Sequence, residues 1–301
     1  MRWAPALRAL LALLALLAFA GRAAALAGRF DTIRPQLDAS PLGIPAIVSS
    51  SEDGDLAQGE VHALLALPFP LLAERLAVPR DWCQIVLLHL NVKACTHERE
   101  AGHDSLTVHS GRKSAENPGT VFPLRFAFRA IDARDGQLEV ELNAAKGPMG
   151  TGDYRIALVA VAVPQGSLLR FSYAYRSTIA SRLAVSGYLA TLGRDKVGFT
   201  SLGNGPDGRP EYVGGRRGIV ERNAVRYYFA VQAHLEVAPG SDEQRFARKL
   251  ERWFELTERY PAQLHEIGRA EYRQGKLKEF ADQARRQQAI DAGNARGAPA
   301  R

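Results

Sequence analysis

The chain has 301 residues, of which 46% are hydrophobic and 24% charged, and its net charge at pH 7 is +7. This mild positive excess, without a basic stripe interleaved with aromatic residues, does not indicate a nucleic-acid partner. Weak attraction to an anionic membrane surface explains it at least as well. After the N-terminal leader, no stretch is apolar enough to predict a membrane-spanning helix.

The first 27 residues have the pattern of a secretory signal peptide. Arg2 and Arg8 form a basic start, residues 9–20 are an apolar run, and Ala25-Leu26-Ala27 is a small-residue cleavage site, with residues 23–25 as a second candidate. The apolar run is too short to span a bilayer comfortably. We therefore expect export to a bacterial periplasm. Cleavage after residue 27 would lower the net charge from +7 to +4, because three arginines and no acidic residue are lost.

The next segments predict an extension, a strand and two helices. Residues 28–58 are mixed in composition, with Ile44 to Val48 as a candidate edge strand. Residues 60–67 predict the first main strand, which Pro68-Phe69-Pro70 ends. A helix is expected over residues 69–77, and a second helix begins at Pro79 with Asp81 in its first turn.

The chain has two cysteines, Cys83 and Cys95. In an oxidising compartment an even count favours a disulfide. One continuous helix would hold the two residues about 18 Å apart, so a disulfide requires the helix to end near Asn91 and the chain to double back. A zinc site formed by Cys83, His89, Cys95 and His97 is an alternative, although this spacing matches no recurrent zinc module. Free thiols are a third alternative.

Segments with alternating apolar and polar residues then predict an antiparallel meander. They cover residues 105–112, 121–131, 138–142, 154–163 and 169–176. Asp135-Gly136 is a tight-turn signal between the second and third segments.

A long strand is predicted between Ile219 and Val237, after a short helix over 179–192 and a long loop over 197–218. In an extended chain, alternate residues share one face. On that basis Glu221 and Asn223 are polar positions in an otherwise apolar row, which also contains Tyr227 and Phe229.

The last predicted element with a strong apolar stripe is a helix after Ser241. Ser241 is a natural N-cap with Gln244 three residues later. The apolar face of this helix consists of Phe246, Leu250, Trp253, Phe254 and Thr257. A weaker stripe continues beyond Pro261, and residues 282–301 are expected to be frayed or disordered.

The predicted order of strand, two helices, antiparallel meander and long helix resembles the START-like, or helix-grip, superfamily. The residues that carry the resemblance are Glu60 to Leu67, Pro68 to Pro70, Asp81-Trp82-Cys83, the strand from Ile219 to Val237 and the helix after Ser241. The resemblance implies an α+β fold in which a curved antiparallel sheet wraps a long C-terminal helix. We expect a signal peptide at 1–27, an N-terminal extension at 28–58, the START-like domain at 59–260, and a C-terminal helical extension with a basic tail at 261–301.

In this superfamily the space between sheet and helix holds lipids, sterols or other apolar ligands, so the resemblance implies binding of an apolar small molecule or lipid. The ligand-binding candidates are Glu221, Asn223, Tyr227, Phe229 and Trp253. A buried Glu221 paired with an arginine such as Arg125 or Arg155 is an alternative that makes its role purely structural.

No catalytic motif is present in the sequence. His97-Glu98 with His103 misses the spacing of a zinc-protease motif, and no Gly-x-Ser-x-Gly occurs. We expect no metal ion and no cofactor. Three hypotheses remain: a periplasmic binding or carrier protein for an apolar ligand, an enzyme that uses Glu221 as acid or base in the same cavity, and a scaffold with a fully packed core.

Overall fold

The structure is a computed structural model that describes residues 22–112, 121–133, 136–190 and 195–297. Its centre is an eight-stranded antiparallel sheet with the order β1-β2-β8-β7-β6-β5-β4-β3, so β1 and β3 are its edges. The strands are β1 (Ala46–Asp53), β2 (Leu56–Leu65), β3 (Val92–Glu100), β4 (His103–Ser110), β5 (Phe122–Ala133), β6 (Gln137–Lys146), β7 (Thr151–Val163) and β8 (Gly166–Ser177).

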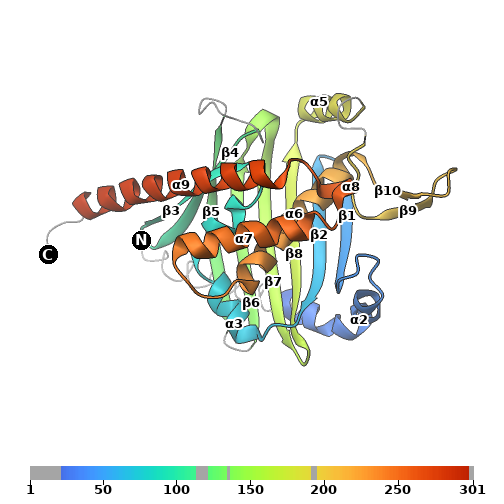
Figure 1. Ribbon diagram of the computed structural model, residues 1–301, viewed down its shortest axis with the longest axis horizontal. Coiled ribbons are helices and arrows are strands. Elements are labelled where there is room, and N and C mark those ends of the chain that lie inside the picture. The colour runs from blue at the N-terminus through green and yellow to red at the C-terminus, as the bar shows by residue number, and fades with distance from the viewer. Residues whose placement is uncertain (1–21, 113–120, 134–135, 191–194, 298–301) are drawn as a thin grey trace, which may run out of the picture.

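Helices lie on both faces of this sheet (Figure 1). We call the face that contacts α6 the inner face and the opposite one the outer face. The helices are α2 (Phe30–Asp38), α3 (Phe69–Leu76), α4 (Pro79–Leu87), α5 (Ile179–Ala190), α6 (Gly215–Glu236), α7 (Asp242–Thr257), α8 (Pro261–Leu264) and α9 (Arg269–Gly297). Helices α3 and α4 carry the chain from β2, near one edge, to β3 at the other. The predicted α+β helix-grip class, in which an antiparallel sheet packs around a long helix, is confirmed.

The meander and the two short helices are confirmed, with boundaries that differ by a few residues. Each predicted strand between residues 105 and 176 is present, and α3 and α4 follow β2 as expected. The candidate edge strand near Ile44 is β1, which pairs with β2 from Ala46 onward. Strand β3 was not predicted because its second half is polar and exposed, which weakens the alternation that marks a strand. Asp135 of the predicted turn lies outside the described residues.

The predicted strand over Ile219 to Val237 is wrong, because this segment is the helix α6. Helix α6 contacts the sheet on one side and α7 on the other. A helix that is covered on all sides has apolar residues around its whole circumference and loses the period of 3.6 that reveals a surface helix. Its buried residues show no single stripe: Gly218, Val220, Glu221, Arg222, Ala224, Val225, Arg226, Tyr228, Phe229, Ala230, Val231, Ala233, His234 and Leu235.

The helix that the sheet grips is therefore α6, and not the helix after Ser241. Helix α6 contacts β1, β2 and β8, whereas α7 contacts α6 and α9. Gly59 of β2 allows the close approach of α6, since a Cβ at this position would collide with the Val220 carbonyl. The N-cap prediction for α7 is confirmed. The Ser241 hydroxyl accepts a hydrogen bond from the Gln244 backbone amide, and the Gln244 side-chain oxygen accepts one from the Ser241 backbone amide.

Two further expectations, for residues 282–297 and for the loop over 197–218, are wrong. Residues 282–297 belong to α9, which runs along the edge strand β3 and past α7 (Figure 1). The contact with β3 holds this segment in a helix although its sequence is mostly polar. The predicted loop over 197–218 contains a two-stranded hairpin, β9 (Ser201–Asn204) and β10 (Pro210–Tyr212), and the first turn of α6.

The outer face of the sheet carries a smaller apolar cluster. Residues 22–28 are helical and lead into α2. Arg22 forms an ion pair with Glu139 at 2.7 Å. The cluster joins this N-terminal segment to β7 and β8 and consists of Ala23, Leu26, Phe30, Ile33, Leu37, Val159, Val161 and Leu168.

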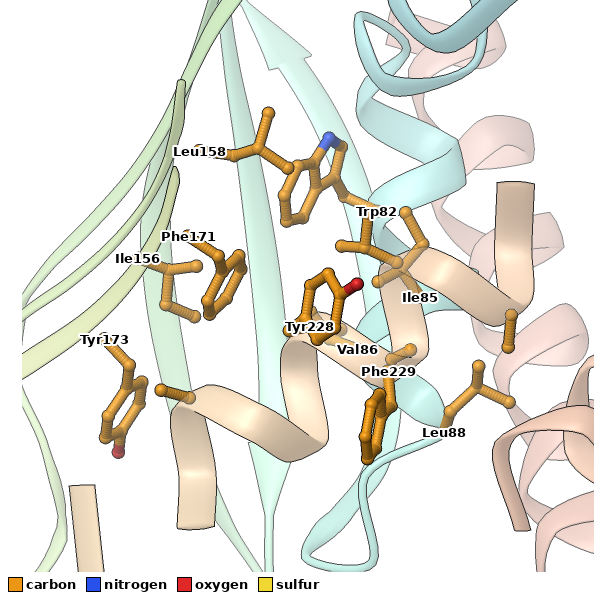
Figure 2. Close-up of a cluster of buried hydrophobic side chains, with 14 of the residues drawn as sticks. Trp82, Ile85, Val86, Leu88, Ile156, Leu158, Phe171, Tyr173, Tyr228 and Phe229 are labelled. Atoms are coloured by element: carbon orange, nitrogen blue, oxygen red, sulfur yellow. The ribbon is translucent and has the colours of Figure 1, made fainter. Parts of the chain in front are cut away.

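The main core lies between the inner face and the helices. In Figure 2 the sheet residues Ile156, Leu158, Phe171 and Tyr173 lie opposite Trp82, Val86, Tyr228 and Phe229 of the helices. Within the described ranges, no helix is both long enough and apolar enough to cross a lipid bilayer.

Candidate ligand cavity

A cavity of about 210 Å³ lies between the inner face of the sheet, α6 and the turn after α4. Strands β4 to β8 each supply lining residues, as does Pro148 of the 3-10 turn Pro148–Gly150. It is lined by Val86, His89, Asn91, Val92, Val108, Ser110, Leu124, Phe126, Leu142, Pro148, Tyr154, Ile156, Tyr173, Asn223 and Tyr227.

His89 is the most constrained polar residue of this cavity. Its Nδ1 accepts a hydrogen bond from the Asn91 backbone amide at 3.2 Å, so its Nε2 carries the proton and donates to Asn223 Oδ1 at 3.3 Å. Burial, together with the positive charges of Arg226 and Lys276, lowers the pKa of His89 to about 3. The imidazole is therefore neutral at physiological pH.

Asn223 and Tyr227 lie one helical turn apart on α6 and both line the cavity. Because Asn223 Oδ1 accepts the hydrogen bond from His89, its amide group presents two donor hydrogens. The Tyr227 ring stacks on the His89 ring, with 4.7 Å between ring centroids and an interplanar angle of 21°. Both residues therefore line the cavity, and the ligand-binding role predicted for them stays a prediction.

Three tyrosines of the sheet and α6 form one wall of the cavity. Tyr173 of β8 lies 5.7 Å from Tyr227 and 6.2 Å from Tyr154, measured between ring centroids. The Tyr154 hydroxyl bonds to the Thr151 hydroxyl at 2.8 Å. No hydrogen bond joins the hydroxyls of Tyr173 and Tyr227 to the described part of the chain. Burial raises the pKa of both groups, so they stay protonated and can donate.

Glu221 is fully buried but does not line the cavity. Its two carboxylate oxygens accept hydrogen bonds from the Ser50 hydroxyl at 2.6 Å, the Thr200 hydroxyl at 2.6 Å, and the backbone amides of Phe199 and Thr200 at 2.5 and 2.9 Å. The predicted pairing with Arg125 or Arg155 is wrong, since Arg125 lies near Glu98 and Glu100 and Arg155 lies on the outer face of the sheet. Glu221 instead joins α6 to β1 and to the segment before the β9–β10 hairpin.

Phe229 and Trp253 also lie away from the cavity. The Phe229 ring stacks on Tyr260 at 5.8 Å between centroids. The Trp253 indole donates a hydrogen bond to the Arg226 carbonyl at 2.9 Å and stacks on Tyr272 of α9 at 5.0 Å. Trp253 therefore holds the three helices α6, α7 and α9 together.

The reason for this division of the predicted site is the helical geometry of α6. Residues two apart share a face in a strand, but they point about 160° apart in a helix. Asn223 and Tyr227 are four residues apart and stay together, whereas Glu221 and Phe229 turn away from them.

The disulfide predicted between Cys83 and Cys95 is present, with 5.0 Å between the two Cα atoms. It joins α4 to β3, because the helix ends at Leu87 and the chain turns back as expected. His97, from the alternative zinc set, bonds to Asp104 at 2.7 Å. Within the residues that the structure places, no cluster of three or more His, Cys, Asp or Glu side chains could hold a metal ion.

Sequence reasoning missed His89 and Tyr173 as cavity residues. The sequence does not distinguish either residue from an ordinary core residue, because a histidine at the end of an apolar helix and a tyrosine in an alternating strand are common in cores. A signal was present in Tyr173 and Tyr154, which lie on the inward faces of two neighbouring strands. Nothing in the sequence connects His89 to Asn223, which is 134 residues away.

Helix α9 supports the cavity wall from behind. The buried Lys276 ammonium donates hydrogen bonds to the carbonyls of His89 and Val92, both at 2.7 Å, and to Glu279 at 2.7 Å. Burial lowers the pKa of Lys276 to about 8. The turn that carries His89 is therefore attached to α9 as well as to α4.

A second hollow of about 650 Å³ lies on the outer face, over β2, β6, β7 and β8. It is open, and charged residues such as Arg22, Glu60, Glu141 and Arg170 line it. An apolar ligand would stay exposed to water there, so the smaller inner cavity is the candidate site.

No family model matches the chain, and no curated protein sequence matches it. Among solved structures, it is similar to human StAR-related lipid transfer protein 5, with 9% identity, a TM-score of 0.31, and coverage of 58% of this chain and 91% of that chain. It is also similar to a STAR-related lipid transfer protein from Xanthomonas axonopodis, with 14% identity, a TM-score of 0.32, and coverage of 62% of this chain and 98% of that chain. A third similar structure is truncated norcoclaurine synthase from Thalictrum flavum, with 14% identity, a TM-score of 0.31, and coverage of 50% of this chain and 91% of that chain. Two of these three solved structures are described as StAR-related lipid transfer proteins.

Proposed function

We propose that this protein binds or carries an apolar or lipid-like ligand in the cavity between α6 and the inner face of the sheet. One observation carries the proposal. A cavity of about 210 Å³ is lined by eight apolar and seven polar residues, and Asn223, Tyr173 and Tyr227 are among the polar ones. Small-molecule sites combine apolar walls with a few polar groups that orient the ligand.

Native mass spectrometry of protein purified from its own host under gentle conditions tests this proposal. We expect a species heavier than the chain by the mass of one small molecule, which organic extraction releases. A spectrum that contains the apo mass alone, with no binding of any apolar probe in solution, would contradict the proposal.

A matched pair of variants in β7 ties the bound species to this cavity. Ile156→Trp places a large ring in the cavity, because Ile156 lines it, whereas Ala157→Trp adds the same ring on the opposite face of the same strand. We expect the first variant to lose the bound species and the second to keep it, with both folded by circular dichroism. Equal retention by both variants would place the ligand elsewhere.

We also propose export to the periplasm, from the signal-peptide pattern in the sequence. Cleavage after residue 27 would remove Arg22, Ala23 and Leu26 from the outer face, and Glu139 would lose its ion pair with Arg22. The intact mass of the protein in a periplasmic fraction measures the start of the mature chain. A mass that begins at Gly28 supports the proposed site, whereas a mass that retains residues 22–27 supports export with an earlier cut. Uncleaved protein confined to the cytoplasm would contradict export.

For a carrier, we propose peripheral contact with an anionic membrane surface through exposed apolar residues beside the cavity. Met149 is 81% exposed, and Ile179 and Leu183 of α5 are each 69% exposed. Helix α5 contacts the Pro148–Gly150 turn, whose Pro148 lines the cavity, and Lys146 is exposed just before that turn. Apolar side chains beside a positive charge suit an anionic lipid interface.

Flotation with lipid vesicles tests this contact. We expect the protein to float with phosphatidylglycerol vesicles more than with phosphatidylcholine vesicles, and the triple variant Met149→Gln, Ile179→Gln, Leu183→Gln to lose this binding. The exposed Val78, 43% exposed on the segment between α3 and α4, offers the control substitution Val78→Gln. Equal flotation of wild type and the triple variant would remove the proposed contact.

A further inference from the structure

The charge, polarity and size of the inner cavity restrict the ligand more narrowly than its apolar walls alone. Of the described residues that line the cavity, none is Asp, Glu, Lys or Arg. The one titratable base, His89, has both ring nitrogens in hydrogen bonds that require the neutral form with the proton on Nε2.

The buried cations behind the cavity do not supply a charge partner either. Lys276 is paired with Glu279 at 2.7 Å, and Arg226 is paired with Glu266 at 2.8 Å. Neither Lys276 nor Arg226 lines the cavity. An ionised ligand would therefore lose its hydration without gaining an opposite charge, which disfavours its binding.

Among the polar residues that line this neutral space, Asn223 and Tyr227 of α6 and Tyr173 of β8 supply three hydrogen-bond donor groups. The Asn223 amide is oriented by His89, which occupies Asn223 Oδ1 and leaves the NH₂ group to donate. The Tyr227 ring is held between the rings of His89 and Tyr173, at 4.7 and 5.7 Å between centroids. The Tyr173 and Tyr227 hydroxyls have no hydrogen-bond partner in the described part of the chain. Polar groups in such a setting are stable when a ligand oxygen satisfies them.

The cavity volume limits the apolar part of the ligand. An apolar cavity of about 150 Å³ in another protein holds benzene, and sites for drug-sized ligands begin at about 300 Å³. At about 210 Å³, this cavity accommodates one or two fused rings or a short chain, and it is too small to enclose the two chains of a diacyl lipid.

We infer that the ligand is a small uncharged molecule, with an apolar body of one or two rings or an equivalent short chain and one carbonyl or hydroxyl oxygen that Asn223, Tyr173 and Tyr227 bind. This inference rests on the proposed ligand-binding function and adds the chemical class of the ligand. It excludes free fatty acids and diacyl phospholipids as occupants.

Calorimetric titration of the full chain with three naphthalene probes tests the inference. The probes are 2-acetylnaphthalene, which is neutral with a carbonyl, 2-naphthoate, which is similar in shape but ionised at pH 7, and naphthalene, which has no polar group. We expect the ketone to bind at least tenfold more tightly than the carboxylate, and also more tightly than naphthalene.

Tyrosine variants locate the polar contact. Tyr227→Phe and Tyr173→Phe remove a single oxygen and keep the rings, so we expect each to weaken ketone binding about fivefold and leave naphthalene binding unchanged. Tyr228→Phe is the matched control, since Tyr228 is buried on α6 but does not line the cavity. Its affinity for the ketone should equal that of the wild type.

Each contrary outcome has a separate meaning. Carboxylate binding as tight as ketone binding, or ketone binding unaffected by both cavity tyrosine variants, would overturn the inferred ligand class. Tight binding of dioleoyl phosphatidylglycerol with no binding of the naphthalene probes would overturn the class while leaving the proposed function in place. Failure of every probe, together with a clean apo mass from the host, would overturn the proposed function and this inference with it.

Discussion

At the scale of single residues, the buried polar groups of α6 have different roles. Glu221 receives four hydrogen bonds from β1 and residues 199–200, which leaves little capacity for a proton-transfer role. Asn223, two residues later, uses its oxygen on His89 and turns its amide to the cavity. We therefore propose a stabilising role for Glu221 and a ligand-binding role for Asn223.

Glu221→Gln should destabilise the fold without changing cavity binding. An amide nitrogen would replace one carboxylate oxygen and meet donors, so we expect a loss of about 3 kcal/mol in the free energy of unfolding. Urea denaturation measures this loss, and Glu236→Gln near the exposed end of the same helix is the control, with an expected change below about 0.5 kcal/mol. A stable Glu221→Gln protein with weakened probe binding would reverse the assignment.

His89 should make stability depend on pH. Its pKa is about 3 in the folded protein and near 6.5 when unfolded, so between these values the unfolded chain binds more protons. Stability from this group is fully present above pH 6.5 and falls as the pH is lowered, by about 1.4 kcal/mol per pH unit. Wild-type protein should lose folding stability between pH 6.5 and pH 4.5. In His89→Gln we expect this loss in the free energy of unfolding to be smaller by about 2 kcal/mol, as measured by urea denaturation at each pH. His103→Gln, at an exposed position, should leave the pH profile unchanged, and an unchanged profile in His89→Gln would refute the prediction.

At the scale of elements, α9 protects an edge of the sheet. Strand β3 is an edge strand, and unpaired backbone groups there can recruit another chain. The Gln283 side chain accepts a hydrogen bond from the Cys95 amide, and the Gln287 side chain both accepts from and donates to the backbone of His97. A mostly polar helix is thereby fastened to the sheet by side-chain amides in place of a neighbouring strand.

The double variant Gln283→Leu, Gln287→Leu should expose this edge. Losing three hydrogen bonds from partly buried groups is expected to cost about 2–3 kcal/mol and to promote association through β3. Urea denaturation and light scattering after size-exclusion chromatography measure the two effects. Gln288→Leu, exposed on the same helix, is the control for added apolar surface. A double variant as stable and monodisperse as this control would show that α9 does not protect the edge.

At the scale of the whole molecule, the cavity wall depends on distant parts of the chain. The disulfide joins α4 to β3, Lys276 joins α9 to the turn between them, and His89 on that turn contacts α6. The disulfide closes a short loop that carries His89 and so restricts the unfolded chain as well as the wall.

Replacing both cysteines, as Cys83→Ala with Cys95→Ala, should lower the free energy of unfolding by about 3 kcal/mol, as for other loops of this length. Urea denaturation with and without reductant measures the effect. Reductant should destabilise the wild type to a similar extent and leave the double variant unchanged. Titration of two free thiols in unfolded, unreduced wild-type protein would contradict the prediction.

Much of the fold could be predicted from local sequence patterns. Along much of the meander one face is more buried than the other, so the strands alternate visibly, and the signals at Pro79 and Ser241 act within a single helical turn. The disulfide followed from the cysteine count and from the end of α4. These features depend on neighbouring residues and on burial of one side only.

Tertiary structure alone decided the nature of α6 and the composition of the site. Because the sheet and α7 bury α6 on opposite sides, its sequence has no helical period, and an alternating pattern fitted it by chance. The strand interpretation then placed Glu221, Asn223, Tyr227 and Phe229 on one face, whereas the helix keeps Asn223 with Tyr227 and turns the other two away. Contacts across 134 residues between His89 and Asn223, and across 171 between Ser50 and Glu221, leave no local trace because packing brings these residues together.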